Sequence, residues 1–393
     1  MIRRVLLSVL ILSLSSMTLT GCWDRIEIND VAIVMATSFD KTKDGQYSVA
    51  VQMAIPGNMG GSSGGGGGGS SGQKPYYVDS DVGKTIREAN DRLQARLSRR
   101  LYFAHRRILV VGDELAREGI REIFDVVARV PENRLTANMV IAKGEGVELL
   151  RAQPQFEQFS AEAMREIVES EAVVNARLKD VAHDLGQTGF DPLIPYMDVV
   201  NQQGGEEKSK EVQVVGYAQF RDDKMVDSFE GDAMKGIAWL RPHFHPYSAT
   251  IGDKKIGKAT LQLYKGETKI DPILKKDHVH FNVRVEARAY GLEALSSMDL
   301  ARDENVRRLE KALDKQVHAS IETALNQMKD KQTDVAGLGM LVSRNYPGIW
   351  TDKLSKNWHE QIPKITATIQ VDTRISRIGQ ITENIAKREE SPK

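Results

Sequence analysis

The residue with the clearest chemical role in this 393-residue chain is Cys22, the only cysteine. It ends the segment Leu19-Thr20-Gly21-Cys22, which fits the lipobox pattern of a thiol that accepts a diacylglyceryl group before a peptidase cuts. Only a thiol forms the thioether, and small residues such as Gly21 let the peptidase approach the backbone. A lone cysteine has no disulfide partner and forms no cysteine-based metal site. We therefore expect lipid on Cys22 and cleavage between Gly21 and Cys22; the alternative is a free cysteine that follows a signal peptide by chance.

The residues before Cys22 have the composition of a signal peptide. Arg3 and Arg4 form a short basic start, and residues 5–19 form an apolar run diluted only by Ser and Thr. A basic start, a short apolar core and small residues before a cleavage site are typical of a secretory signal. No later apolar run approaches the ~20 residues of a transmembrane helix. Residues 1–21 are therefore predicted to be removed, leaving a body tethered by diacylglyceryl, with a further N-acyl chain as an option.

Other patterns with chemical potential are weaker. Residues 252–260 (GDKKIGKAT) nearly match a P-loop, but Ala259 stands where a hydroxyl must follow Lys258, and the next residues suggest a strand, so we predict a β-hairpin. The pairs His243/His245 and His278/His280 are spaced to share a strand face, as zinc ligands can, but no third-ligand motif accompanies them. No Gly-x-Ser-x-Gly elbow is present. The sequence predicts no enzyme, cofactor or metal.

Charge excludes one large class of partner. The chain has 54 Lys and Arg against 54 Asp and Glu, so its formal net charge is zero. Proteins that bind nucleic acid usually concentrate a basic excess. We therefore expect no nucleic-acid partner.

The elements of residues 22–200 predict a mixed α/β region, in which a division into two subdomains stays open. Two apolar segments, 31–39 and 47–55, flank the turn signal Lys43-Asp44-Gly45 and predict a hairpin. Residues 57–72 contain mostly glycine and predict a flexible loop rather than a phosphate-binding one. The pattern then predicts the following elements: a helix from Ser80 or Asp81 to about 100, a strand 107–111, a helix 112–128, a strand 135–142 and a mostly helical stretch 156–183.

Residues 201–211 (NQQGGEEKSKE) are polar and predict a linker. Beyond it, residues 212–385 predict an α+β domain, followed by a polar tail at 386–393. Its expected elements are a hairpin around 221–223, a helix 231–240, strands 259–264 and 278–290, a long helix 302–330 and a closing strand 365–375. The predicted fold is thus multi-domain α+β, with antiparallel strands of the second region packed on the long helix.

The residues directly after Cys22 are unusual for a lipoprotein tether. They mix charge with an aromatic ring, and the residues of this candidate interface motif are Trp23, Asp24, Arg25, Glu27, Asn29 and Asp30. Such a mixture suits a bilayer interface. The alternative is that the chain is simply entering its first strand, and composition leaves both open.

The sequence resembles the Ger(x)C family, the C subunits of nutrient germinant receptors in endospore-forming bacteria. The opening Gly21-Cys22-Trp23-Asp24-Arg25 joined to the lipobox is the most specific part of the resemblance. Further segments resemble later family blocks, and the resemblance covers essentially the whole chain: 101–105, 109–116, 131–134, 193–195, 216–220, 334–339, Pro347, Trp350 and Trp358. Ile26 and Val130 depart from the family pattern.

The resemblance implies a non-enzymatic subunit on the outer face of the spore inner membrane. Members of this family act with a multi-pass A subunit and a multi-pass, transporter-like B subunit to start germination. A second hypothesis is a substrate-binding lipoprotein of a transporter, which would need a ligand cleft between two similar α/β lobes. The dissimilar patterns of the two regions count against it.

Overall fold

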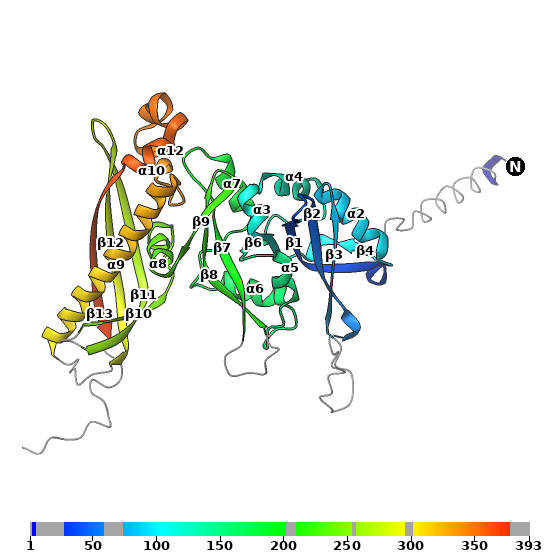
Figure 1. Ribbon diagram of the computed structural model, residues 1–393, viewed down its shortest axis with the longest axis horizontal. Coiled ribbons are helices and arrows are strands. Elements are labelled where there is room, and N and C mark those ends of the chain that lie inside the picture. Colours follow the sequence, from blue (N-terminus) through cyan, green and yellow to red (C-terminus); the bar gives the residue numbers. More distant parts are fainter. Residues whose placement is uncertain are drawn as a thin grey trace, which may run out of the picture.

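The computed structural model describes residues 2–4, 27–58, 74–201, 210–253, 257–294 and 302–377. The chain forms two β-sheets that lie side by side along the long axis of the molecule, each covered by helices (Figure 1). Within the described residues, no helix is both long and apolar enough to span a bilayer. The mixed α+β fold predicted from the sequence is confirmed.

The first sheet is built by the N-terminal half of the chain and continues into the second region. Its strands are β1 (Val31–Lys41), β2 (Tyr47–Ala54), β3 (Tyr76–Gly83), β4 (Arg100–Tyr102), β5 (Ile108–Gly112), β6 (Asn138–Ala142), β7 (Leu193–Asn201), β8 (Lys210–Arg221) and β9 (Lys224–Glu230). Its helices are α2 (Ile86–Arg96), α3 (Asp113–Glu118), α4 (Arg121–Arg129), α5 (Gly146–Arg151), α6 (Ser160–Glu169) and α7 (Leu178–Gly186).

The sheet is parallel at its centre and antiparallel at both edges. The strand order is β3-β2-β1-β5-β6-β7-β8-β9, and β4 pairs with the start of β1. Strands β1, β5, β6 and β7 run parallel, whereas the two edge pairs on each side are antiparallel. Parallel strands are normally covered on both faces and have continuous apolar sequences. This explains why 107–111 and 135–142 could be predicted as strands from composition alone.

Helices cover both faces of this sheet, and β5 shows how its residues are divided between them. Ile108 and Val110 enter the core under α5 and α6, whereas Leu109 and Val111 enter the core under α2, α3 and α4. Alternation follows from the two-residue period of a strand. All four residues are fully buried.

The predicted helix start at Ser80 or Asp81 is wrong. Both residues lie in β3, where Ser80 pairs with Ala50 and Asp81 with Val49 of β2. Helix α2 begins later, capped by Thr85, whose hydroxyl accepts the N–H of Glu88 at 3.1 Å. The side chain of Glu88 accepts the N–H of Lys84 at 2.8 Å. The helix start thus resembles a capping box, except that the glutamate binds the residue before the N-cap and not the N-cap itself. Serine and aspartate favour helix starts locally, but pairing with a distant strand prevails here.

Two further expectations change in detail. The predicted mostly helical stretch 156–183 contains two helices, α6 and the start of α7, separated by a loop. Strand β7 follows directly and pairs with β8, so Asn201 and Lys210, at the two ends of the predicted linker, belong to neighbouring strands of one sheet. Residues 202–209 between them lie outside the described residues, as do 59–72 of the glycine-rich loop and the tail 386–393.

The second sheet has the order β10-β11-β12-β13. Its strands are β10 (Tyr247–Asp253), β11 (Gly257–Leu274), β12 (Val279–Ala294) and β13 (Thr366–Arg377). The helices beside it are α8 (Gly231–Leu240), α9 (Asp303–Lys331), α10 (Leu338–Asn345), α11 (Pro347–Ile349) and α12 (Trp358–Gln361). The near P-loop is a hairpin, as predicted, with Thr250 opposite Thr260. The closing strand β13 runs parallel to β12, unlike the other pairs of this sheet.

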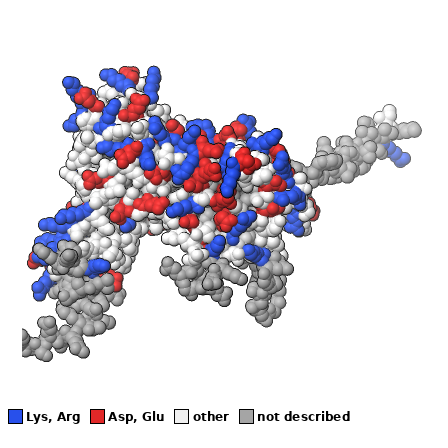
Figure 2. Space-filling model, in the orientation of Figure 1, with Lys and Arg blue, Asp and Glu red and all other residues white. Residues whose placement is uncertain are grey.

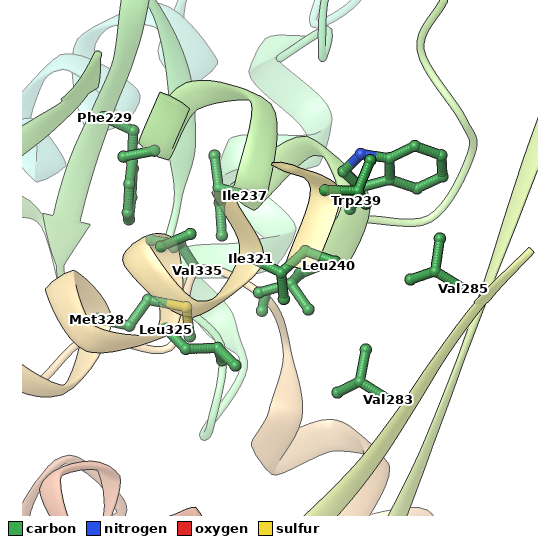
Figure 3. Close-up of a cluster of buried hydrophobic side chains, with 14 of the residues drawn as sticks. Phe229, Ile237, Trp239, Leu240, Val283, Val285, Ile321, Leu325, Met328 and Val335 are labelled. Carbon is green, nitrogen blue, oxygen red and sulfur yellow. The ribbon is translucent and has the colours of Figure 1, made fainter. Parts of the chain in front are cut away.

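Helix α9 packs its predicted apolar stripe on the sheet and on α8. Its residues Leu309, Leu313, Val317 and Ile321 are buried, together with Ala324, Leu325 and Met328. Figure 3 shows Ile237, Trp239 and Leu240 of α8 beside Ile321 and Leu325 of α9 and opposite Val283 and Val285 of β12. Figure 1 shows α9 extending along the length of the sheet.

Candidate functional site

The structure describes only part of the predicted site. Gly21, Cys22, Trp23, Asp24 and Arg25 lie outside the described residues, so lipidation and cleavage stay predictions. Glu27, Asn29 and Asp30 are exposed, and residues 28–30 form a single 3₁₀ turn that leads into β1. The start of β1 pairs with β4, at the opposite end of the molecule from α9 and α12 (Figure 1).

A different set of residues forms a densely hydrogen-bonded polar cluster at the junction between the two sheets. Asp191 precedes β7 of the first sheet, and Asp334 lies between α9 and α10 beside the second. The N–H of Asp191 donates to the carbonyl of Asp334 at 2.9 Å, and the N–H of Asp334 donates to Oδ2 of Asp191 at 2.6 Å. Both residues are almost fully buried. Two segments 143 residues apart are therefore joined in both directions.

The carboxylate of Asp334 holds the start of α10 and an indole together. Its Oδ1 accepts the N–H of Leu338 at 2.8 Å, and its Oδ2 accepts the N–H of Gly339 at 2.6 Å and Nε1–H of Trp358 at 2.7 Å. Burial raises the pKa of Asp334 to about 6, and the three donated hydrogen bonds oppose that rise. Because every contact is a donor, the charged form fits the site.

The carboxylate of Asp191 holds a turn and an imidazole. Its Oδ1 accepts the N–H of Asp222, in the β8–β9 turn, at 2.8 Å, and Nε2 of His359 lies 3.0 Å from Oδ2. The hydrogen bond to Asp191 raises the pKa of His359, against a lowering by burial. Asp222 has φ of 53°, a left-handed conformation that a hairpin turn requires.

Asp191, Asp222 and His359 place metal-ligand atoms within 4.8 Å of one another. Both oxygens of Asp191 already accept backbone N–H groups, however, and a cation would have to displace these bonds. The Asp191–His359 separation is that of a hydrogen-bonded ion pair. The hydrogen bonds of Asp191 to Asp222, Asp334 and His359 account for this arrangement as a cross-link between segments. The expectation of no metal stays a prediction.

Tight backbone packing surrounds these carboxylates. Gly189 has φ of +84°, and a Cβ at Gly339 would lie 2.8 Å from its Cα. Trp350 covers both glycines, and its ring centroid lies 5.2 Å from that of Trp358, edge to face. Gly189 and Gly339 are glycines because the two backbones approach more closely than side chains allow.

A groove of about 450 Å³ opens beside the junction, and Arg241 forms part of its wall. Arg241 Nη1 donates to the carbonyl of Val335 at 2.9 Å, and its guanidinium lies 4.8 Å from the ring centroid of Phe190. Burial lowers the pKa of Arg241, and the charges of Asp184 and Asp334 oppose this. Burial also raises the pKa of Asp184 to about 6. The cation is thus already balanced by the carboxylates around it.

A second hydrogen-bonded set joins the sheets beneath the junction. Nε2 of the fully buried Gln219, in β8, donates to Oγ1 of Thr333 at 2.6 Å. Nε2 of Gln327, in α9, donates to Oε1 of Gln219 and to the carbonyl of Ser228, both at 2.9 Å. Both junction sets hold one sheet against the other. In the described part of the chain, the side-chain hydrogen bonds of His359 also go to Asp191. The polar groups of the junction therefore bind one another and form a structural clamp between the two sheets.

The two histidine pairs do not share a site. His280 lies in β12 and His278 immediately before it, but His243 and His245 lie in the loop after α8, where His243 has φ of 71°. The predicted common strand face for His243 and His245 is therefore wrong. His280 Nδ1 hydrogen-bonds Thr366 at 2.8 Å, and His245 Nδ1 lies 2.9 Å from the carbonyl of Glu171.

Comparison with known proteins agrees with this two-part architecture. Residues 24–199 match the family model described as spore germination protein N-terminal domain. Residues 215–379 match the model described as spore germination B3/GerAC like, C-terminal. The chain therefore belongs to the GerAC family of spore germination proteins, as the sequence resemblance predicted.

Individual relatives extend the match to nearly full length. The "Putative spore germination protein YfkR" of Bacillus subtilis (strain 168) is 31% identical, over 87% of this chain and 88% of its own. Spore germination protein KC of the same organism is 29% identical, over 96% and 97%. The crystal structure of the GerBC protein superimposes with a TM-score of 0.56 at 15% identity, covering 86% of this chain and 96% of that one. That last similarity supports the fold.

The junction unites family-like segments that are far apart in the sequence. Asp334 and Gly339 belong to the block 334–339, Trp350 and Trp358 were also singled out, and Asp191 lies two residues before the block 193–195. Sequence reasoning missed Asp191 and His359 as functional partners. His359 directly follows Trp358, but adjacency to a family-like residue was the only available signal.

Proposed function

We propose that this chain is the lipid-anchored, non-catalytic C subunit of a nutrient germinant receptor. The observation that carries the proposal is the family match over both halves of the chain, combined with the lipobox that ends at Cys22. In this proposal diacylglyceryl on Cys22 holds the body on the outer face of the spore inner membrane. The multi-pass A and B subunits are its partners, and the complex triggers germination.

The junction supports a role in assembly. A lipid on Cys22 attaches the first sheet to the membrane by its β1 and β4 end, whereas the second sheet lies beyond the junction. The Asp191–Asp334 clamp fixes the position of the second sheet relative to that anchored end. A subunit that positions one surface above a membrane needs such a rigid connection more than it needs a reactive group.

The transporter-lipoprotein alternative is less well supported. It requires two similar lobes around a ligand cleft. The two sheets here differ in strand number, order and direction. Charged side chains of both signs intermingle on the face shown in Figure 2.

A deletion series tests the proposal. Spores that lack this chain are expected to lose their response to particular nutrients while germinating normally with a non-nutrient trigger. Re-expression of the intact chain should restore the response, and re-expression with Cys22→Ser should restore it poorly. Normal responses of the deletion spores to every nutrient, in a strain without other family members, would refute the proposal.

A further inference from the structure

In the described part of the chain, Arg106 is a buried cation with no ion pair or hydrogen bond to a carboxylate. It is 5% exposed, and its Nε and Nη2 atoms have no hydrogen-bond partner within the described residues. Its guanidinium lies 5.9 Å from the ring centroid of Phe103. Burial lowers its pKa to about 10, which still leaves it charged near neutral pH. A buried, uncompensated charge is costly, so a site of this kind calls for water or an anion.

Arg106 lines two cavities, and the smaller suits water. That cavity holds about 40 Å³ and also contains Oγ1 of Thr37 and Oδ1 of Asn133, both buried and without a partner in the described structure. A water needs roughly 10–15 Å³ and two or more polar contacts. One or a few waters there would bridge these oxygens to the guanidinium, but they would not neutralise its charge.

The larger cavity, which we call the arginine pocket, has a volume of about 280 Å³. Besides Arg106, its charged or titratable lining side chains are His105, Arg107, Arg134, Arg165 and Glu169. Four arginines and one carboxylate thus contribute to this lining.

Only one of these arginines is well neutralised. Arg165 pairs with Glu162, Glu166 and Glu169. Nε of Arg107 is 3.9 Å from Glu162, at the limit of an ion pair. Within the described residues, the side chain of Arg134 makes no hydrogen bond or ion pair. The charge of Arg134, and most of that of Arg107, is therefore available to a ligand.

The pocket is held by backbone contacts. The N–H of Arg107 donates to the carbonyl of Met35, and the N–H of Asn138 donates to the carbonyl of Arg107, both at 2.9 Å. Nδ2 of Asn138 donates to Glu169 at 3.0 Å, and its Oδ1 is buried without a partner. These bonds join two family-like segments, 101–105 and 131–134, through the residues that follow each. The backbone segments that carry Arg107 and Asn138 are therefore fixed beside the cavity.

We propose that the arginine pocket binds a phosphate group. Guanidinium groups bind phosphate oxygens through paired, charge-assisted hydrogen bonds. A single carboxylate offers two oxygens and one charge, which one guanidinium satisfies. A phosphate presents more oxygens, which the exposed guanidinium groups of Arg107 and Arg134 can share, and Arg106 also contributes to the lining.

The placement of the pocket favours a membrane lipid as the source of the phosphate. The strand β4 that precedes the pocket pairs with the first residues of β1, and Val31 lies opposite Arg100. Only eight residues lie between Cys22 and Val31, so the two can be at most roughly 30 Å apart. A lipid on Cys22 would keep the pocket within reach of phospholipid head groups. The lipid source rests on the proposed anchoring, whereas the phosphate chemistry does not.

The test uses the mature-length chain with Cys22→Ser, so that no covalent lipid contributes. Inorganic phosphate is titrated by phosphorus NMR, and vesicles of phosphatidylglycerol with phosphatidylcholine are used in a sedimentation assay. The pocket variant is Arg107→Ala with Arg134→Ala, and both side chains are exposed enough to leave the fold intact. The matched control, Arg284→Ala with Arg288→Ala, removes the same charge from the exposed face of β12. Thermal unfolding checks that both variants fold.

We expect phosphate binding to weaken about tenfold or more in the pocket variant and to change by less than about twofold in the control. A parallel loss of vesicle binding assigns the phosphate to lipid, whereas phosphate binding without vesicle binding assigns it to a soluble ligand. Because the Cys22→Ser protein carries no covalent lipid, both results are independent of whether Cys22 is lipidated in the native protein. Equal losses in both variants would show diffuse charge only and overturn the proposal. So would no binding of either probe.

Discussion

Asp191 and Asp334 exchange hydrogen bonds across the junction, each donating its backbone N–H to the other. Their carboxylates then bind Asp222, His359 and Trp358. Polar groups buried in such a network are stabilising only while every member is satisfied. The junction is therefore the place where small chemical changes should have large consequences for the relative position of the two sheets.

Asp334→Asn should lower the free energy of unfolding by about 2–4 kcal/mol. The substitution keeps the shape but turns an amide NH₂ toward Gly339 and Trp358, which are donors. Urea unfolding measures the difference. The control is Asp352→Asn on the exposed surface, which should change stability by less than about 0.5 kcal/mol. Equal effects of the two substitutions would show that the network does not hold the junction.

His359 should make stability depend on pH. Its pKa is raised from 6.5 in the folded state by the bond to Asp191. A raised pKa means that the folded state holds the proton more tightly, so the stabilisation is complete below about pH 6.5 and is lost as pH rises through the folded value. The stability advantage of the wild type over His359→Gln should shrink on going from mildly acidic to alkaline pH.

The control for that titration is His318→Gln, at a half-exposed histidine 4.0 Å from Glu322. Asp334 titrates in a separate range. Its raised pKa of about 6 means that the folded state favours the protonated carboxyl, so its contribution to stability decreases as pH rises from about 4 to about 6. A constant difference between the wild type and His359→Gln across neutral pH would contradict the ion pair with Asp191.

Gly236→Ala should be strongly destabilising. A Cβ there would collide with the carbonyl of Ser320, because α8 and α9 approach closely at this position. Overpacking of this kind costs about 1–3 kcal/mol. Gly348→Ala is the matched control, since nothing lies within 4 Å of its added Cβ. Thermal unfolding of both variants measures the difference. Equal stability of Gly236→Ala and Gly348→Ala would contradict the close packing of α8 on α9.

Cys22→Ser should release the folded body from the membrane. Two acyl chains give stable anchoring, with each buried methylene contributing ~0.8 kcal/mol, and serine cannot form the thioether. Fractionation of cells, with circular dichroism of the released protein, measures the outcome. Recovery of the variant wholly in the membrane fraction would mean that another segment anchors the chain.

The sequence predicted the elements whose signals are local. The apolar stripe of α9 has a helical period over 29 residues, and the central strands β5 and β6 are short apolar runs because both faces are buried. The hairpin of β8 and β9 was predicted from its turn residues, including Asp222. In each case a few neighbouring residues determine the structure.

The contacts that form the junction and the arginine pocket had no local signal. Asp191 and Asp334 are 143 residues apart, and an aspartate before a proline suggests only a turn. Arg106 lies in a basic stretch that is indistinguishable in composition from an exposed surface; only the fold shows that it is buried. Strand β3 was missed because its pairing with β2 overrides the helix-start preference of Ser80 and Asp81.

The most direct test of the central claim is a pull-down from detergent-solubilised spore membranes, with a tag at the C-terminus of the intact chain. We predict that two multi-pass proteins, the A and B subunits, co-purify with the chain, and that the same solubilised membranes from a strain with an untagged chain yield neither. Recovery of the chain alone, or with an ATP-driven permease, would contradict its assignment as a germinant receptor subunit.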